Sequence, residues 1–218
     1  MARPGSDVAM CNLALDLIKE TTISVLTGAG VTKTEALCAR WYDVIRQSVL
    51  SAYNWNFALL SYEIPRGGTP GVSDYPDYYI FPNDYLKLRA IEDPRVPLSR
   101  KIYEIQGRTL LYNNGGAATL PVWYTTDETD ITKWPALFIK LLSEELALVL
   151  GKKLTARPSI LKDIKEDLAE TRRLARAIDG QMRPPKRYES SRIVNAGLSL
   201  SSNRTVAGDY EFPAGMQE

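Results

Sequence analysis

The hydrophobic pattern of this chain changes within the stretch SAYNWNFALLSYEI, residues 51–64. Before Trp55 the apolar residues recur every three or four positions, which predicts amphipathic helices. After Phe57 the chain consists of short runs rich in Tyr, Ile, Val and Thr, separated by Gly, Pro and Asn-Asp, which is typical of antiparallel strands and turns. Helical spacing returns near Trp134 and stops at about Gly180. This order predicts an α+β fold: mainly a helical bundle of four helices, with an inserted small antiparallel β domain and an extended C-terminal arm.

Two helices are predicted before this point. Ser6 can cap the first, expected over residues 7–20, whose wide apolar face implies neighbours on more than one side. Thr32 and Glu35 form a capping-box pattern at the start of the second, expected to end near residue 53. We expect the two helices to form a hairpin that buries a shared core.

Six strands are predicted in the insert, at residues 59–64, 78–81, 86–91, 102–105, 109–112 and 120–125. Two hairpins are suggested, because Gln106-Gly107 is a tight-turn pattern and Asn113–Gly116 permits positive φ before the last strand. The stretch Arg66–Ser73 is rich in glycine, so we expect an exposed loop there rather than regular structure.

Two further helices are predicted after the insert. The third begins near Trp134-Pro135 and has little polar surface before Gly151, so we expect it at the centre of the bundle. The fourth begins at Arg157-Pro158 and lies on the surface, with its charges forming ordinary salt bridges. Its apolar stripe comprises Leu161, Ile164, Leu168, Thr171, Ala175 and Ile178. The domains expected are a helical hairpin at 1–58, the β domain at 59–126, the completing helices at 127–180 and the arm at 181–218.

The composition is that of a soluble globular protein, with 44% hydrophobic and 24% charged residues. No run approaches the roughly 20 apolar residues that span a bilayer, and the N-terminal residues lack the apolar core of a signal peptide, so we expect synthesis in the cytoplasm. Cys11 and Cys38 fall in apolar helical stripes, which predicts buried free thiols. Residues 1–150 carry a net charge of −3 and residues 151–218 a net charge of +4, a difference too small to indicate a dedicated nucleic-acid binder.

The chain has no histidine, which excludes Ser-His-Asp and Cys-His catalysis and the zinc sites that use imidazole. Neither GxxxxGK[ST] nor GxGxxG is present. We therefore expect no catalytic residues, no cofactor and no metal. A carboxylate pair could still be imagined from Glu144-Glu145 and from Asp127, Glu128 and Asp130. However, adjacent helical residues point about 100° apart, and Asp127 and Asp130 suit the start of a helix.

An aromatic cluster surrounds Pro76 and Pro82 and comprises Tyr75, Tyr78, Tyr79, Phe81 and Tyr85. It could stack on single-stranded nucleic acid. Because Asp74, Asp77 and Asp84 are interleaved and would repel phosphate, core packing or a protein interface is the favoured interpretation.

Several segments resemble one known family. They are Cys11–Ile18, Ile23–Leu26, the run Tyr42–Leu50 that leads into Trp55–Ala58, the segment Tyr79–Lys87 with Pro82-Asn83-Asp84, and the hairpin Tyr103–Arg108. In this order they resemble the head-to-tail adaptor proteins of short-tailed phages, also called tail tubular protein A, over roughly residues 8–178. Two features depart from that family: Lys19 follows Ile18 where a glycine is common, and the 66–73 loop is longer.

The resemblance implies a structural adaptor of the virion neck, assembled in the host cytoplasm as a homo-oligomeric ring, typically twelvefold, that lines the passage for DNA during genome ejection. It implies contact with the portal protein and with the tail nozzle or fibres, only transient contact with DNA, and no membrane partner. The expected portal-binding residues are Arg183, Lys186, Arg187, Tyr188, Arg192, Leu198, Tyr210 and Phe212. The expected tail-docking residues are Gly67, Gly68, Pro70, Tyr75 and Tyr78.

Two alternatives remain open from the residues themselves. One is a tail-associated cell-wall hydrolase that depends on the carboxylates Glu144 and Glu145. The other is a helical DNA-binding module that uses Arg172, Arg173 and Arg176 of the fourth helix.

Overall fold

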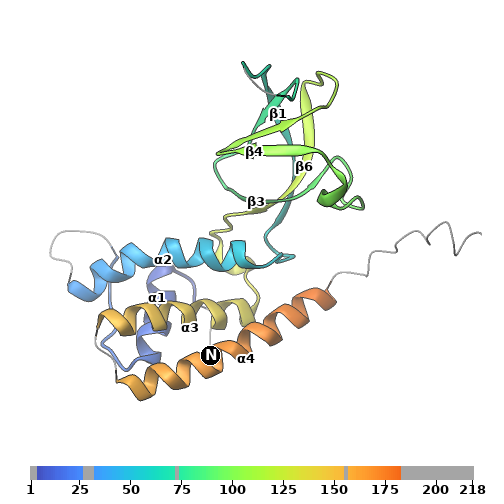
Figure 1. The fold of residues 1–218 in the computed structure, drawn as a ribbon. Helices are drawn as coiled ribbons and strands as arrows, with labels where there is room; N and C mark the ends of the chain where they lie inside the picture. Colours follow the sequence, from blue (N-terminus) through green and yellow to red (C-terminus); the bar gives the residue numbers. More distant parts are fainter. Residues whose placement is uncertain (1–3, 27–31, 72–73, 155–156, 183–218) are drawn as a thin grey trace, which may run out of the picture. The chain divides into compact units, whose positions relative to one another are not determined.

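The computed structural model describes residues 4–26, 32–71, 74–154 and 157–182. The described part contains four α-helices and six β-strands (Figure 1). The helices are α1 (Asp7–Leu17), α2 (Lys33–Ala52), α3 (Ala136–Lys153) and α4 (Pro158–Gln181). The strands are β1 (Leu59–Gly68), β2 (Tyr78–Ile80), β3 (Tyr85–Ile91), β4 (Tyr103–Gln106), β5 (Thr109–Tyr112) and β6 (Thr119–Thr126). Two short 3-10 helices, Leu98–Arg100 and Ile131–Lys133, complete the order. The predicted α+β class and the predicted order of elements are confirmed.

The helix starts follow the predicted capping patterns. The Ser6 hydroxyl accepts the Ala9 N–H at the start of α1, and Thr32 and Glu35 form a complete capping box at the start of α2. The first helix ends at Leu17 rather than at Glu20, because the backbone turns through a left-handed residue, Lys19, with φ 59°.

The bundle is organised around α3, which lies between α2 and α4 in Figure 1. α1 and α2 both contribute to one bundle core, and each packs more extensively against α3 than against the other. The central place predicted for α3 is confirmed, and one apolar cluster joins all four helices. Cys11 and Cys38 are buried free thiols in this cluster, as expected.

The connection after α1 is fixed by one side chain. The side-chain amide of Asn12 accepts the N–H of Ile23 at 2.8 Å and donates to the Ile23 carbonyl at 3.0 Å. The side chain therefore satisfies both backbone groups of Ile23, as a neighbouring strand would. Ile23 is thereby held in the bundle core. This role belongs to a polar residue that the helical pattern of the sequence does not single out.

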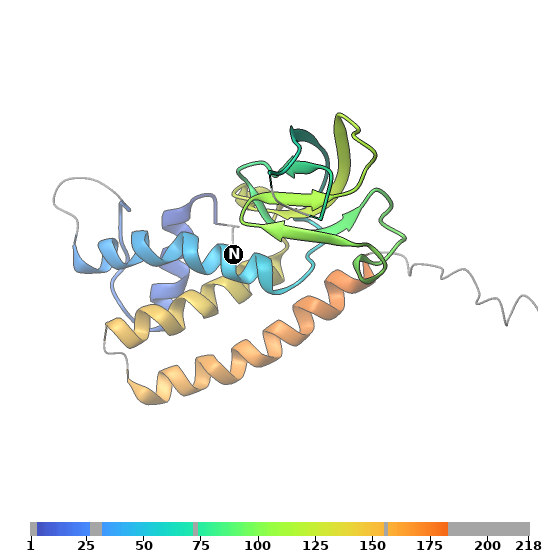
Figure 2. The ribbon, with the colours of Figure 1, turned by 45° about the horizontal axis from the view of Figure 1, so that its top comes forward.

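The strands form an antiparallel sheet in the order β3-β6-β1-β2-β5-β4, which curls around its own apolar cluster (Figure 2). The β4–β5 hairpin at Gly107 is confirmed, with φ 60° at that glycine. Gly115 and Gly116 have positive φ as predicted, yet no hairpin follows them. Instead β6 pairs with β1 and β3, while β5 pairs with β2 and β4.

The glycine-rich stretch after Ile64 is the main correction to the predicted strands. β1 continues to Gly68 and pairs with β2. Arg66 lies opposite Tyr79 and Gly68 lies opposite Tyr78, with a register shift between the two pairs. The sequence pattern predicts a loop there because glycine weakens strand propensity. In the structure, the absence of a Cβ at Gly67 makes room for the Tyr78 ring.

Candidate docking surfaces and the junction that positions them

The segment Trp55-Asn56-Phe57, where the hydrophobic period changes, packs against the bundle directly after α2. Trp55 is buried, and its indole N–H donates to the Val49 carbonyl at 2.9 Å. Its ring meets the Phe138 ring of α3 edge to face at 5.3 Å, and Phe57 packs on the Phe138 ring at 4.7 Å. The Trp55-Asn56-Phe57 segment is therefore part of the bundle core.

The same segment is tied to the end of α4. The Asn56 N–H donates to the Asp179 carboxylate at 3.1 Å, and its side-chain amide donates to the Asp179 carbonyl and carboxylate. Burial raises the pKa of Asp179, although the Asn56 backbone N–H and the nearby Arg89 favour its charged form. From β3, Arg89 donates to the carbonyls of Trp55 at 2.7 Å and Asn54 at 3.0 Å. The segment that enters the sheet is thus held by Asp179 of α4 and by Arg89 of β3.

The exit from the sheet is held by a bidentate ion pair. Arg46 of α2, only 5% exposed, donates through Nε and Nη2 to the two carboxylate oxygens of Asp127, each at 3.0 Å. Burial disfavours the charge of Arg46, but Asp127 and Asp43 outweigh it and leave the pKa raised. Asp127 therefore does not cap a helix as the sequence suggests, whereas Asp130 does cap the 3-10 helix at Ile131–Lys133.

Entry and exit also lie side by side, since the Thr126 N–H donates to the Ala58 carbonyl at 2.9 Å. The sheet is consequently attached at a single place by hydrogen bonds and an ion pair. Such an attachment fixes the position of the loops of the sheet relative to the helices of the bundle.

Three of the five predicted tail-docking residues lie together. Gly67 and Gly68 sit at the end of β1 beneath the ring of Tyr78 on β2. Pro70 follows β1 and Tyr75 precedes β2, both half-buried.

This end of the sheet is stiffened by an ion pair. Arg66 contacts the buried Asp77 at 2.6 Å, and Asp77 also accepts the Gly116 N–H at 2.9 Å. The sequence pattern gave no sign of this pair, because Arg66 lies 11 residues away from its partner.

The rest of the aromatic cluster forms the core of the sheet. Tyr79 is buried and donates to the Ala117 carbonyl at 3.1 Å, and the rings of Phe81 and Tyr85 stack 3.8 Å apart. The favoured interpretation, core packing, is confirmed for these three residues. Asp84 accepts the hydroxyls of Tyr124 and Thr126 within the same sheet.

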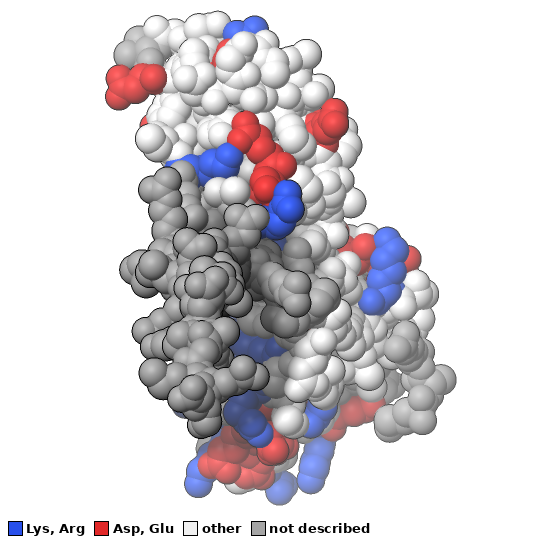
Figure 3. All heavy atoms as spheres, turned by 90° about the vertical axis from the view of Figure 1, so that its right-hand side faces the viewer, with Lys and Arg blue, Asp and Glu red and all other residues white. Residues whose placement is uncertain are grey.

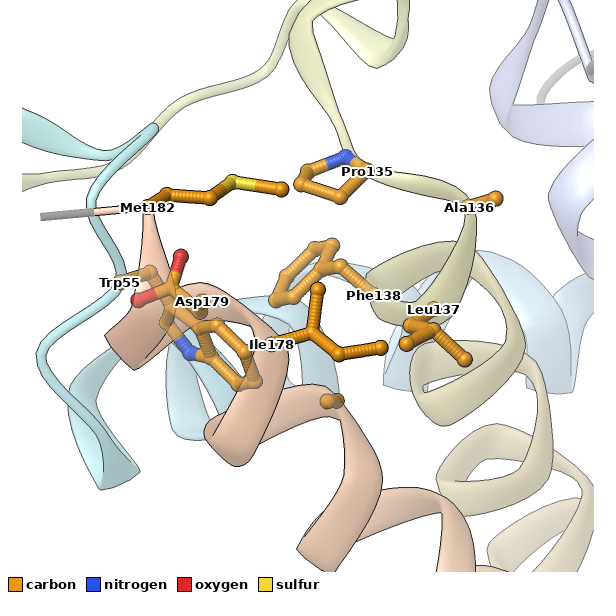
Figure 4. A pocket seen from close by; sticks show the side chains of 9 residues that line it. Trp55, Pro135, Ala136, Leu137, Phe138, Ile178, Asp179 and Met182 are labelled. Atoms are coloured by element: carbon orange, nitrogen blue, oxygen red, sulfur yellow. The ribbon is translucent and has the colours of Figure 1, made fainter.

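An apolar hollow of about 210 Å³ lies beside the end of α4 (Figure 4). The Phe138 ring and the Ile178 side chain face each other across it, and Met182 and Pro135 approach it from the other side. Ile178, the last residue of the predicted apolar stripe, is 42% exposed. Asp179 occupies the buried position instead, because it accepts the hydrogen bonds of Asn56.

The two helical carboxylates of the hydrolase alternative have separate partners. Glu144 is buried and accepts the Thr171 hydroxyl at 3.2 Å, while Glu145 pairs with Arg172. Burial raises the pKa of Glu144, and its second oxygen has no hydrogen-bond partner among the described residues. Both carboxylates bind α4, so each has a role in packing α3 against α4.

Two of the three arginines of the DNA-binding alternative are also engaged within the chain. Arg172 pairs with Glu145, and the guanidinium of Arg176 lies over the ring of Tyr53 at 5.4 Å. Arg173 is exposed. Of these three arginines, Arg173 is the one that makes no ion pair or ring contact with another described residue.

The expected portal-binding residues, 183 to 212, lie outside the described residues. In the part of the chain that the structure describes, no group of three or more acidic, cysteine or histidine side chains is arranged to hold a metal. No described helix has the length and apolar character needed to cross a membrane. Comparison of the sequence with models of known protein families and with curated proteins finds no match.

Proposed function

We propose that this chain is a structural head-to-tail adaptor of a short-tailed phage, which forms a ring between the portal and the tail nozzle or fibres and surrounds the DNA passage. The observation that carries the proposal is the element order: two helices, a curled antiparallel sheet, then two helices. That order agrees with the one implied by the resemblance of residues 8–178 to the adaptor family. The comparisons with known proteins add nothing to this argument.

The junction supports the proposal on physical grounds. A connector must transmit a fixed orientation between two neighbours, and its two parts must not swing freely. The Arg46–Asp127 pair and the Asn56–Asp179 hydrogen bonds hold both crossings between bundle and sheet. The proposal assigns portal contact to the 181–218 segment and tail contact to the β1–β2 end of the sheet, at Gly67, Gly68, Pro70, Tyr75 and Tyr78.

The test mixes the purified full-length chain with its cognate portal and measures the mass of the product by mass photometry. We expect a complex of fixed stoichiometry with several copies of the chain per portal, and electron microscopy should show a ring. A matched variant that ends at Met182 keeps all four helices and should lose portal binding. Absence of any complex with the full-length chain would contradict the proposal.

The alternatives have distinct readouts. A hydrolase would clear a cell-wall zymogram, and Glu144→Gln or Glu145→Gln would abolish the clearing. A DNA-binding module would show affinity that falls steeply with salt and depends on Arg172, Arg173 and Arg176. Either result, without a portal complex, would replace the adaptor proposal.

A further inference from the structure

The charges of α4 are segregated by face. At about 100° per residue, its surface divides into three stripes roughly 120° apart. The buried stripe packs on α3 and consists of Ile164, Leu168, Thr171 and Ala175. The basic stripe consists of Lys162, Lys165, Arg172 and Arg176, and the acidic stripe consists of Asp163, Glu166, Asp167 and Glu170. Arg173 lies between the two charged stripes, on the outer face of the helix. The two charged stripes therefore flank the buried one on opposite sides.

These charges are largely not neutralised within the helix. Among the described residues, one ion pair joins two members of α4, Lys162 and Glu166, at 3.9 Å between exposed side chains. The partner of Arg172 is Glu145 on α3. Ordinary salt bridging along the helix, which the sequence suggests, is therefore not what the structure shows. Figure 3 shows both acidic and basic atoms at the lower end of the molecule, the level at which Figure 1 places α4.

A groove accompanies the basic stripe. It has a volume of about 650 Å³ and lies between α3 and α4. Its lining includes Lys152, Lys162 and Lys165 together with the apolar Leu148 and Leu161. Among the described residues of the lining, Glu145 is the one acidic residue, and it is paired with Arg172. This flank of α4 is therefore a cationic groove with a partly apolar lining.

The opposite flank has the complementary character. Beyond the acidic stripe, the same side of α4 carries Leu174 and Ile178, which are 37% and 42% exposed. An exposed ridge of carboxylates that continues into apolar side chains matches a groove of lysines with a partly apolar lining in both charge and polarity. The acidic ridge and the cationic groove that match each other are both on this chain.

We infer that α4 joins copies of this chain head to tail, with the acidic stripe of one copy in the cationic groove of the next. The occupant is a second copy because the complementary surface is on this chain itself. Two different faces about 135° apart around the helix axis cannot form a twofold contact with themselves, but successive copies can close a ring through them. The inference rests on the proposed function, since it names the surfaces through which the ring forms.

The test uses two charge-reversed variants of the full-length chain. Lys162→Glu/Lys165→Glu makes the groove acidic, and Asp167→Lys/Glu170→Lys makes the ridge basic. Each variant alone places like charges at every contact, so we expect the ring on the portal to fall at least about tenfold in yield. An equimolar mixture restores opposite charges at every contact, and we expect rings to return, with a yield that decreases as salt rises.

The control is Arg40→Glu/Lys87→Glu, which lowers the net charge as much as the groove variant does, at exposed positions outside α4. Thermal unfolding of each variant establishes that it is folded. A ring formed by either reversed variant alone, or no ring from the mixture of folded variants, would overturn the inference. If the wild type binds no portal, the proposed function fails, and self-association of the mixture in sedimentation still decides the inference. If the wild type also fails to self-associate, both are wrong.

Discussion

The space above Gly67 is filled by the ring of Tyr78. A Cβ at this position would overlap the ring and lie 2.7 Å from its Cδ2. We expect Gly67→Ala to reduce the free energy of unfolding by about 1–3 kcal/mol, because the ring or the strand must shift. Chemical denaturation measures this change. Gly71→Ala, where a Cβ would meet nothing within 4 Å, should have a much smaller effect. If the two variants unfold alike, the packing role of Gly67 is wrong.

The Arg46–Asp127 pair should be the most costly contact of the junction to break. Asp127→Asn leaves the guanidinium of Arg46 buried with only the exposed Asp43 as a charged partner. We expect a loss of about 3 kcal/mol in the free energy of unfolding, because a buried charge loses its main partner. Asp43→Asn removes the exposed partner and should cost less than about 1 kcal/mol. Equal losses from the two variants, measured by urea denaturation, would show that Asp127 has no special role.

The contact of α3 with α4 should depend on pH through Glu144. Burial raises the pKa of this carboxyl above its ordinary value of 4.5, so the folded chain holds the proton more tightly than the unfolded chain. Its contribution to stability is therefore complete below pH 4.5 and decreases as pH rises through the raised pKa.

We expect Glu144→Gln to remove this decrease, so that stability above pH 4.5 falls less with pH than in the wild type. Denaturation at a series of pH values measures the slope. The matched variant Glu145→Gln changes the neighbouring carboxyl, which pairs with Arg172 at the surface, and should keep the wild-type slope. A Glu144→Gln slope identical to that of the wild type would contradict the assignment.

The bundle should fold without the sheet. The Thr126 N–H bonds to the Ala58 carbonyl, so a short Gly-Ser linker can replace residues 59–126 without moving either end. Among the described residues of the insert, Leu86 is the one that packs against the apolar cluster of the bundle, so nearly all apolar contacts of the bundle remain. We expect a helical circular dichroism spectrum and cooperative thermal unfolding at a lower temperature than the full chain, since the contacts of Arg89 are lost. A non-cooperative transition would show that the bundle is not an independent domain.

The sequence predicts the elements well because each depends on local pattern. The capping of α1 and α2, the β4–β5 turn at Gly107 and the six strands follow from residues that are close together along the chain. Element boundaries fail where a distant residue decides them. β1 extends to Gly68 only because Tyr78 and Asp77, about ten residues away, provide a ring and a carboxylate for it.

The structure brings only some residues of the predicted tail-docking surface together, for the same reason. Gly67, Gly68 and Tyr78 lie together, and Gly67 has a packing role beneath the Tyr78 ring that its sequence neighbours do not indicate. The hollow near Met182 combines side chains from the junction, α3 and α4, which no local pattern connects.

The sequence by itself determined the fold class, the order of helices and strands, and the burial of the two thiols, because hydrophobic period and capping act over a few residues. Only the tertiary structure decided the pairing of β6 with β1, the packing of α1 against α3 more than against α2, and the Arg46–Asp127 ion pair between residues 81 positions apart. It also decided which charges of α4 line a groove. These features depend on which surfaces meet in space. A helical pattern shows that a charge is off the buried face, but the neighbouring helix decides whether that charge lines a groove or faces open solvent.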